Sequence, residues 1–219
     1  MKNGITIVAG KLSLAVLRRI ASGGTPVALD AATRSIIEAS RQAVQKAVDD
    51  PPSAADKSDD ALRKVALVMT FADVKPGQKV LELIPGGGYF TRVFSAIVGS
   101  QGHVYTVWPD EYAKEAESDV TAMRKLAAQP HYANISLLTQ PANQLSSPVP
   151  VDLVFTSQNY HDYPDKFMGK VDPAVLNKQV FDALKPGGLW VIIDHVAPAG
   201  SGMADADTLH RSDPVIVKK

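Results

Sequence analysis

The sequence predicts an α/β fold class: a Rossmann-like open, mostly parallel twisted sheet with helices on both faces, preceded by an N-terminal helical extension. From Lys79 onward, short runs rich in β-branched residues alternate with stretches whose apolar residues recur at helical spacing. Strands that alternate with helices pair in parallel, through right-handed crossovers. In addition, consecutive glycines from Gly86 to Gly88 follow the first of these strands, where such a sheet binds its ligand.

Residues 1–72 are expected to form the helical extension and residues 73–219 the sheet domain. From Asp30 to Val48 the apolar residues lie near helical spacing, with Asp30 as a plausible N-cap, so this segment predicts an amphipathic helix. The segment Asp49 to Asp60 contains adjacent prolines among small and acidic residues, which is typical of a surface linker. A second helix is expected from about Asp60 to Thr70.

Within the sheet domain, the helix after the glycines has the clearest pattern. Phe90, Val93, Phe94 and Ile97 stand at i, i+3, i+4 and i+7, so one face is apolar. Strands are predicted at Lys79–Ile84, His103–Val107, Asn134–Thr139, Val151–Thr156 and Leu189–Asp194, and helices at Tyr89–Val98, Glu111–Ala127 and Pro173–Leu184.

The composition excludes several kinds of site. The chain has 219 residues, of which 45% are hydrophobic, enough for a substantial core. Lys and Arg together number 23, as do Asp and Glu, so bulk charge favours neither nucleic acid nor an anionic membrane as partner. The absence of cysteine excludes disulfides, thiolate zinc sites and a cysteine nucleophile.

The N-terminus decides the expected location. No apolar run approaches the roughly 18 residues that span a bilayer, so a soluble chain is expected. Lys11, Arg18 and Arg19 interrupt the apolar runs near the N-terminus, which favours a cytoplasmic location. The alternative is a periplasmic protein whose export signal is degraded.

The glycines fit one nucleotide fingerprint poorly. A GxGxxG pattern would begin at Gly86 and include Gly88, but its third position is Thr91 rather than a small residue that permits close packing. This weakens a nicotinamide-dinucleotide interpretation. A tight turn without a ligand remains an alternative.

A second pattern fits better. The stretch VLELIPGGGYFT resembles the first motif of class I S-adenosylmethionine-dependent methyltransferases, an acidic residue at a strand end followed by GxGxG. Glu82 matches the acid, Gly86 and Gly88 match the last two glycines, and Ile84 stands where the first glycine is usual. The stretches GHVYTVWP, VDLVFTSQNYHDY and LKPGGLWVIIDH resemble later strands of that superfamily in the same order, so that the resemblance covers Lys75 to His195.

A narrower resemblance extends toward both ends of the chain. DDALRKVALVMTFADVKPGQKVLELIPGGGYFT, NYHDY and TLHRSDP together are similar to a bacterial group of predicted methyltransferases, some of which carry export signals. In that group the chain continues after HRSDP into a helix and two strands. We therefore expect the last strand pair of the sheet to be absent from this chain, which ends at Lys219.

The resemblance implies S-adenosylmethionine as cofactor and a set of residues that bind it. Glu82 would accept a hydrogen bond from the cofactor's amino group, and the backbone of Gly86, Gly87 and Gly88 would face its carboxylate. Alternatively, Glu82 pairs with a base or caps the next helix. The remaining expected cofactor residues are Trp108 at the ribose position, Asp110 (or Glu111) on the ribose hydroxyls, Asn143 at the adenine edge, and Asn159 in the fourth-strand motif. Trp108 could instead serve only the core.

His161 is the main candidate for catalysis. Its ordinary pKa near 6.5 suits a general base toward a hydroxyl or amine acceptor, with Asp162 or Asn159 to orient it. Alternatively, His161 caps a helix or bonds a neighbouring loop. His210 and Arg211 in TLHRSDP would gate the cofactor or bind an acidic substrate, or lie in a solvated loop before a helix capped by Asp213.

No metal is expected. The stretch IIDHVAPAG resembles the magnesium-binding segment of catechol O-methyltransferases, with Asp194 and His195 at the metal positions. However, magnesium prefers oxygen ligands, and the aspartate that those enzymes carry after the fourth strand corresponds to about Ser157.

The sequence as a whole predicts an S-adenosylmethionine-dependent methyltransferase that acts on a small-molecule acceptor, with no nucleic acid or membrane partner. The extension is expected to cover the cofactor cleft. One alternative is a catalytically inactive binding module with the same fold. A weaker alternative is a nicotinamide-dependent oxidoreductase.

Overall fold

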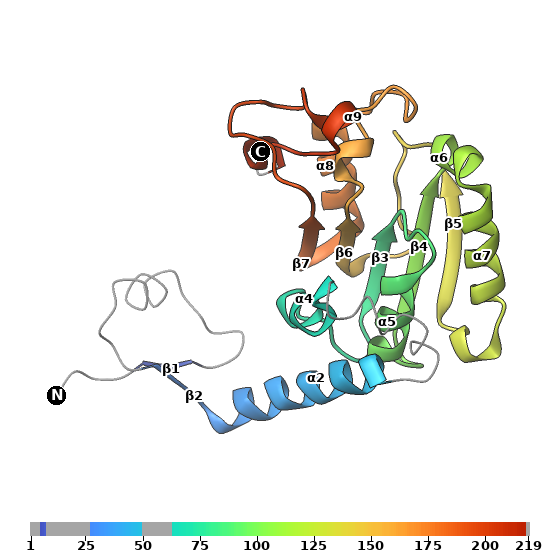
Figure 1. The fold of residues 1–219 in the computed structure, drawn as a ribbon. Helices are drawn as coiled ribbons and strands as arrows, with labels where there is room; N and C mark the ends of the chain where they lie inside the picture. The colour runs from blue at the N-terminus through green and yellow to red at the C-terminus, as the bar shows by residue number, and fades with distance from the viewer. Residues whose placement is uncertain (1–4, 8–26, 50–62, 218–219) are drawn as a thin grey trace.

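The computed structural model describes residues 5–7, 27–49 and 63–217. Within this part of the chain the strands β3 to β7 form one parallel sheet in the order β5-β4-β3-β6-β7 (Figure 1). Their bounds are β3 (Lys79–Leu83), β4 (His103–Pro109), β5 (Ile135–Gln140), β6 (Val151–Ser157) and β7 (Leu184–Ile193). The predicted fold class is confirmed. Most of the N-terminal segment considered for a degraded export signal, the predicted linker after Asp49 and the start of the second helix lie outside the described residues.

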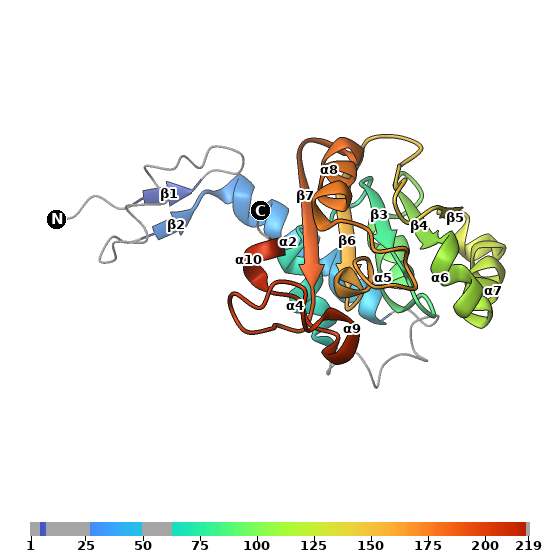
Figure 2. The same ribbon diagram turned by 90° about the horizontal axis from the view of Figure 1, so that it is seen from above.

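Helices cover both faces of the sheet (Figure 2). On one face, α4 (Val65–Phe71), α5 (Tyr89–Val98) and the end of α7 (Glu117–Ala127) pack into a cluster with Val80 and Phe155. On the other face, α8 (Pro173–Ala183) packs into a second cluster around Leu81 and Val154. Neighbouring residues of β3 and β6 thus point to opposite clusters, as the pleat of a strand requires.

The predicted helix from Glu111 to Ala127 is wrong as a single element. It is divided into α6 (Asp110–Glu115) and α7 at Ala116, whose φ of −110° and ψ of 37° leave the helical region. Tyr112 packs on the second core cluster, whereas Met123 packs on the first. α7 itself contributes Val120 to the second cluster and Met123 to the first, so the chain crosses between the clusters within α7. No glycine or proline marks the break in the sequence.

The first part of the extension, up to Asp49, contains two short strands as well as the predicted helix. It comprises β1 (Ile5–Ile7) paired in parallel with β2 (Val27–Leu29), and α2 (Ala31–Asp49), which Asp30 caps through a 2.7 Å bond from the Thr33 N–H to Oδ1. Figure 1 shows α2 beyond the end of the sheet at which the strands begin. It packs there against α4 and α5, because Val44 is buried in the same cluster as those helices. α2 therefore does not cover the cleft at the opposite end, and of the described part of the extension Arg63 lines that cleft.

Short elements complete the described chain. They are the 3₁₀ turns η2 (Pro130–Tyr132) and η3 (Tyr160–Asp162), and the helices α9 (Ala206–Leu209) and α10 (Pro214–Val217). Asp213 caps α10 as predicted, since its Oδ1 accepts the Val215 N–H at 2.9 Å. In the part of the chain that is described, no helix has both the length and the apolar composition needed to cross a membrane.

Candidate cofactor cleft and the His161 cluster

A cavity of about 410 Å³ opens where the carboxyl ends of β3, β4 and β6 meet. The order of the strands reverses between β3 and β6, and open α/β sheets bind ligands at this point. Five of the residues predicted to bind the cofactor contribute to the wall: Glu82, Gly86, Gly87, Trp108 and Asn159. The volume lies in the range of pockets that hold small molecules.

The glycine turn presents bare backbone to this cavity. A Cβ placed on Gly86 or Gly87 would meet nothing within 4 Å. Gly88 differs, because a Cβ there would approach the Met123 Sδ to 2.6 Å, and its φ is +80°. Gly86 and Gly87 thus border the space for a ligand, whereas Gly88 permits α7 to pack closely over the turn. Gly88 is not among the residues that line the cavity.

Ile84 carries the backbone conformation that explains the usual glycine at its position. Its φ is +52°, a region that a β-branched residue rarely occupies. Its N–H donates to the Val107 carbonyl at 2.8 Å, and its carbonyl accepts the Asn159 Nδ2 at 3.1 Å. The turn therefore has the left-handed backbone conformation at this position even though the residue is isoleucine and not glycine.

Glu82 has a polar partner in the fold. The Thr91 hydroxyl donates to its Oε2 at 2.6 Å. Thr91 is the residue that stands where a dinucleotide-binding fingerprint would have its third glycine, and here it binds the Glu82 carboxyl group. Burial raises the pKa of Glu82 to about 8, although Thr91 and the charge of Arg92 lower it in part. At neutral pH the group is thus largely protonated, and an approaching cation would favour its ionised form.

Trp108 and Asn159 frame the cavity from the neighbouring strands. Trp108 is buried, packs edge-to-face on Tyr112 with ring centroids 5.5 Å apart, and has no hydrogen-bond partner for Nε1 among the described residues. Asn159 donates through Nδ2 to the carbonyls of Ile84 and of Ser157, the latter at 2.7 Å. These two hydrogen bonds connect the loop that follows β3 with the loop that follows β6.

Two predicted cofactor residues lie elsewhere. Asp110 begins α6 and does not line the cavity, and its neighbour Glu111 accepts the Ala142 N–H at 2.9 Å. Asn143 is exposed, and its carbonyl accepts a hydrogen bond from Gln179 of α8. In that part of the wall the structure places Tyr112 and Asp119 instead. No local sequence signal pointed to them, because the break at Ala116 separates the two residues onto different helices.

Two arginines of the wall were also missed. Arg63, in the extension, lies over the Tyr89 ring at 4.7 Å, and Arg92 of α5 donates to the Gly87 carbonyl at 3.0 Å. Arg92 was detectable from its place in the first turn after the glycines. Arg63 follows the predicted linker, and nothing in its local sequence points to a ligand.

His161 does not line this cavity. Its ring is buried, and Nδ1 bonds the Asp194 Oδ1 at 2.7 Å, while its backbone N–H donates to Asp194 Oδ2 at 3.2 Å. The orienting carboxylate is thus Asp194, and not Asp162 or Asn159 as expected. Burial lowers the pKa of His161, but the hydrogen bond and charge of Asp194, together with the charges of Asp162 and Asp165, raise the pKa above its usual value.

Asp194 also binds the loop that follows β7. It accepts the His195 N–H at 2.8 Å and the Ser212 hydroxyl at 2.9 Å. His195 itself is exposed, with its Nε2 3.3 Å from the Gln158 Nε2. The Asp194 carboxylate therefore holds both His161 and the segment around Ser212 in place through hydrogen bonds.

Asp162 and His210 complete the surroundings of His161. Asp162 is buried, with Oδ1 3.3 Å from the His161 Nε2, and burial raises its pKa to about 6. His210 is exposed, and its ring centroid is 5.1 Å from that of His161. Arg211 donates to the Val196 carbonyl at 3.1 Å, so of the predicted pair only His210 reaches the cluster.

Comparisons with known proteins identify relatives of this chain. A family model described as protein-L-isoaspartate(D-aspartate) O-methyltransferase matches residues 39–193. The protein-L-isoaspartate O-methyltransferase of Methanococcus aeolicus is 30% identical over 161 residues, which are 73% of this chain and 63% of that protein. A ubiquinone/menaquinone biosynthesis C-methyltransferase of Vibrio campbellii is 30% identical over 127 residues, 57% of this chain and 44% of that protein.

The fold is shared with a solved structure. The crystal structure of a SAM-dependent methyltransferase from Aquifex aeolicus matches with a TM-score of 0.50 and 21% identity, over 74% of this chain and 77% of that chain. The chain spans less than two thirds of the length of the curated relatives named above, 63% and 44%.

Proposed function

The chain belongs to the protein-L-isoaspartate(D-aspartate) O-methyltransferase family, and we propose that it transfers a methyl group from S-adenosylmethionine to a carboxylate, the free α-carboxylate of an isoaspartyl residue in a peptide or protein. The observation that carries the cofactor is the open backbone edge of Gly86 and Gly87 at the switch point of the sheet. The acceptor is proposed from the family and from the relatives that share its name. It differs from the small-molecule acceptor that the sequence predicts.

The cavity supports a defined orientation of the cofactor. The backbone of Gly86 and Gly87 would approach its carboxylate, and Glu82 would accept from its amino group, as the resemblance of the first motif implies. Trp108, from the next strand, would lie beside the nucleoside, and Asp119 would take the role expected of Asp110 on the ribose hydroxyls. In this orientation the positive charge of the cofactor favours the ionised form of Glu82.

The chemistry of a carboxylate acceptor suits the wall of the cavity. The methyl group of the cofactor is already activated, so the protein has to align the reactants and exclude water. A carboxylate is deprotonated at neutral pH and needs no general base, whereas a hydroxyl acceptor does. Among the described residues the wall contains no histidine, but it contains the guanidinium groups of Arg63 and Arg92. Both features favour an anionic acceptor over one that must lose a proton.

The cofactor assignment is tested at Gly87. This residue is exposed, has ordinary φ and leaves room for a side chain, so Gly87→Asp is expected to fold normally. Its carboxylate would repel that of the cofactor, and calorimetric titration is expected to give an affinity for S-adenosylhomocysteine at least tenfold below that of wild type. Ala133→Asp, on the exposed surface between η2 and β5, is the control that should bind normally. If wild type, Gly87→Asp and Ala133→Asp bound S-adenosylhomocysteine with equal affinity, the assignment of the cofactor to this cavity would be wrong.

The acceptor is tested with synthetic peptides and a labelled methyl donor. An isoaspartyl peptide should gain label that is released in mild alkali, as a methyl ester is, while the matching aspartyl peptide should not. Label found only in small molecules of a metabolite extract would refute the peptide acceptor and favour the small-molecule acceptor. Cofactor binding without transfer to either pool would favour an inactive binding module.

A further inference from the structure

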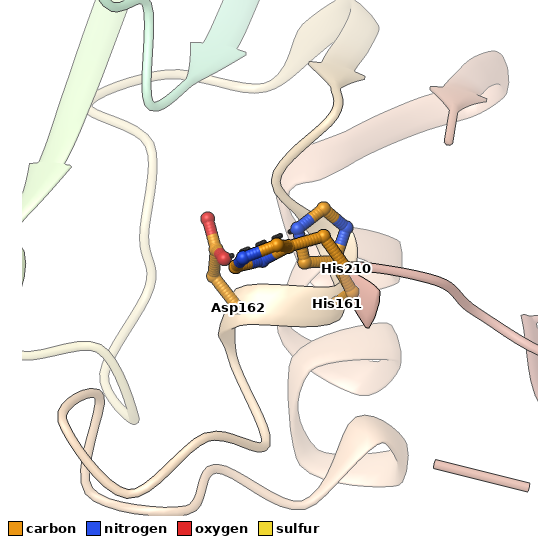
Figure 3. A group of neighbouring side chains, drawn as sticks. All are labelled: His161, Asp162 and His210. Carbon is orange, nitrogen blue, oxygen red and sulfur yellow. Dashed lines mark ion pairs between the residues drawn. The ribbon is translucent and has the colours of Figure 1, made fainter. Parts of the chain in front are cut away.

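Three side chains from two separate segments converge beside the cofactor cleft. His161 and Asp162 belong to η3, and His210 follows α9, which contacts η3. One potential ligand atom of each residue lies within 4.8 Å of the others (Figure 3). His161 and Asp162 are buried and His210 is exposed, so the cluster is closed by protein on one side and open to solvent on the other.

The two buried residues form an ion pair when His161 is protonated (Figure 3), and their spacing is also that of ligand atoms around a common ion. The His161 Nε2 and the Asp162 Oδ1 are 3.3 Å apart. Two ligands at about 2.05 Å from a tetrahedral zinc ion are separated by about 3.3 Å. A charge-assisted hydrogen bond is shorter, about 2.7–2.9 Å. The bond from His161 to Asp194, at 2.7 Å, has that shorter length.

The hydrogen bond to Asp194 also decides which ring nitrogen faces the cluster. When Nδ1–H donates to Asp194, the neutral ring turns the lone pair of Nε2 toward the Asp162 carboxylate. Two lone pairs then face each other, and a proton or a metal ion has to lie between them. No other hydrogen-bond donor to the Asp162 side chain is found in the described segments. A carboxylate that holds the far nitrogen of a histidine is the usual support of a metal-ligating imidazole.

From these observations we infer that His161, Asp162 and His210 form a binding site for a divalent transition-metal ion, of which Zn²⁺ fits the ligand set best. Two imidazoles and one carboxylate suit zinc or ferrous iron better than magnesium. The Asp194 carboxylate lies outside the ligand set and positions His161. His210 would complete the site through a change of its exposed side chain, and the open side would leave a position for water or a substrate oxygen.

This site differs from the one rejected on sequence grounds. A magnesium site like that of catechol O-methyltransferases would use Asp194 and His195 as ligands, whereas here Asp194 supports a ligand and His195 takes no part. The inference is also independent of the proposed methyl transfer, because it concerns side chains outside the wall of the cofactor cavity.

Direct titration of the full-length chain tests the site. Protein stripped with a chelator and then freed of it is titrated with zinc chloride by calorimetry, in the absence of S-adenosylmethionine. One ion per chain is expected. His210→Ala removes an exposed ligand without disturbing the core, and it should weaken zinc binding at least tenfold. Asp162→Asn should do the same. His131→Ala and His195→Ala, which remove exposed histidines outside the cluster, should leave the affinity unchanged.

The zinc affinity and the cobalt spectrum of the Asp194→Asn variant test whether Asp194 positions His161. Asp194→Asn is expected to weaken zinc about 10–100-fold, as loss of an outer carboxylate typically does. Cobalt(II) bound in place of zinc should give an intense tetrahedral visible spectrum in wild type, and an altered one in this variant. Wild-type protein that binds no zinc at 100 μM would overturn the inference, and so would equal affinities in wild type, His210→Ala and Asp162→Asn. Each result stands whether or not methyl transfer is found.

Discussion

At the scale of single residues, the turn after β3 shows how the chain tolerates an unfavourable conformation. Ile84 has a φ of +52°, which costs an L-residue about 1–2 kcal/mol. Its side chain is buried in the second core cluster, however, and burial of an isoleucine contributes about 1.5–3 kcal/mol. The two effects offset each other, so isoleucine can stand where the resembled motif has glycine.

A pair of variants isolates the conformational cost. Ile84→Ala and Ile84→Gly both remove the buried side chain, but only alanine keeps a Cβ at positive φ. We expect Ile84→Gly to be more stable than Ile84→Ala by about 1 kcal/mol in urea unfolding, the reverse of the usual order in regular structure. A glycine variant that is the less stable of the two would mean that the left-handed conformation carries no strain.

Glu82 makes the stability of the protein depend on pH. Its pKa is 4.5 in the reference state and about 8 in the fold, so the folded chain holds the proton more tightly. This group's contribution is therefore fully present below pH 4.5 and is lost as the pH rises through about 8. Glu82→Gln cannot ionise, and its free energy of unfolding relative to wild type is expected to rise by more than about 1 kcal/mol between pH 5 and pH 8.5.

Urea unfolding at the two pH values measures this effect. The exposed residue Glu115 supplies the control, since Glu115→Gln should show no comparable trend. If the difference between Glu82→Gln and wild type were the same at both pH values, the raised pKa of Glu82 would be disproved.

At the scale of elements, the turn between β3 and α5 gives adjacent glycines different tasks. Gly88 lets Met123 and Leu126 of α7 pack against the turn, and a Cβ there would come within 2.6 Å of the Met123 Sδ. Gly87 borders open space. The same turn thus both binds a helix and leaves room for a ligand.

Alanine substitutions separate these tasks. Gly88→Ala is expected to destabilise the fold by about 1–3 kcal/mol, through overpacking and the positive φ. Gly87→Ala should change stability by less than about 0.5 kcal/mol. Chemical unfolding compares them, and equal stabilities would show that α7 is not held closely against the turn. The result also explains why Gly87 is the better position for testing cofactor binding.

The elements differ in how far the sequence could predict them. Alternating apolar runs predicted all the strands of the large sheet, and α5 was predicted with its observed bounds. The break at Ala116 could not be predicted, because no glycine or proline stands near it in the sequence. The bond between His161 and Asp194 joins loops after different strands, so no local pattern contains it. Local periodicity thus gave the elements, while contacts between loops required the three-dimensional structure.

At the scale of the whole molecule, the described part of the extension is joined to the sheet domain by its core. Val65 and Met69 of α4 are fully buried in the same cluster as α5 and Phe155. The predicted boundary between residues 72 and 73 therefore falls inside a continuous hydrophobic contact. We expect α4 to unfold together with the sheet.

Two substitutions in α4 test this expectation. Met69 is 0% exposed and Leu67 is 69% exposed. Met69→Ala is expected to lower the free energy of unfolding by about 2–5 kcal/mol, because it leaves a cavity in the common core. Leu67→Ala should change it by less than about 0.5 kcal/mol. A small effect of Met69→Ala on the single unfolding transition would show that α4 is a separate unit.

The order of the strands has a consequence for biosynthesis. β3 pairs on one side with β4, where Val80 faces Val104, and on the other with β6, where Val80 faces Leu153. A ribosome therefore releases β3, β4 and β5 while the partner for the other edge of β3 is still untranslated. Until Val151–Ser157 emerges, the nascent chain exposes the hydrogen-bonding groups of one edge of β3 to other chains.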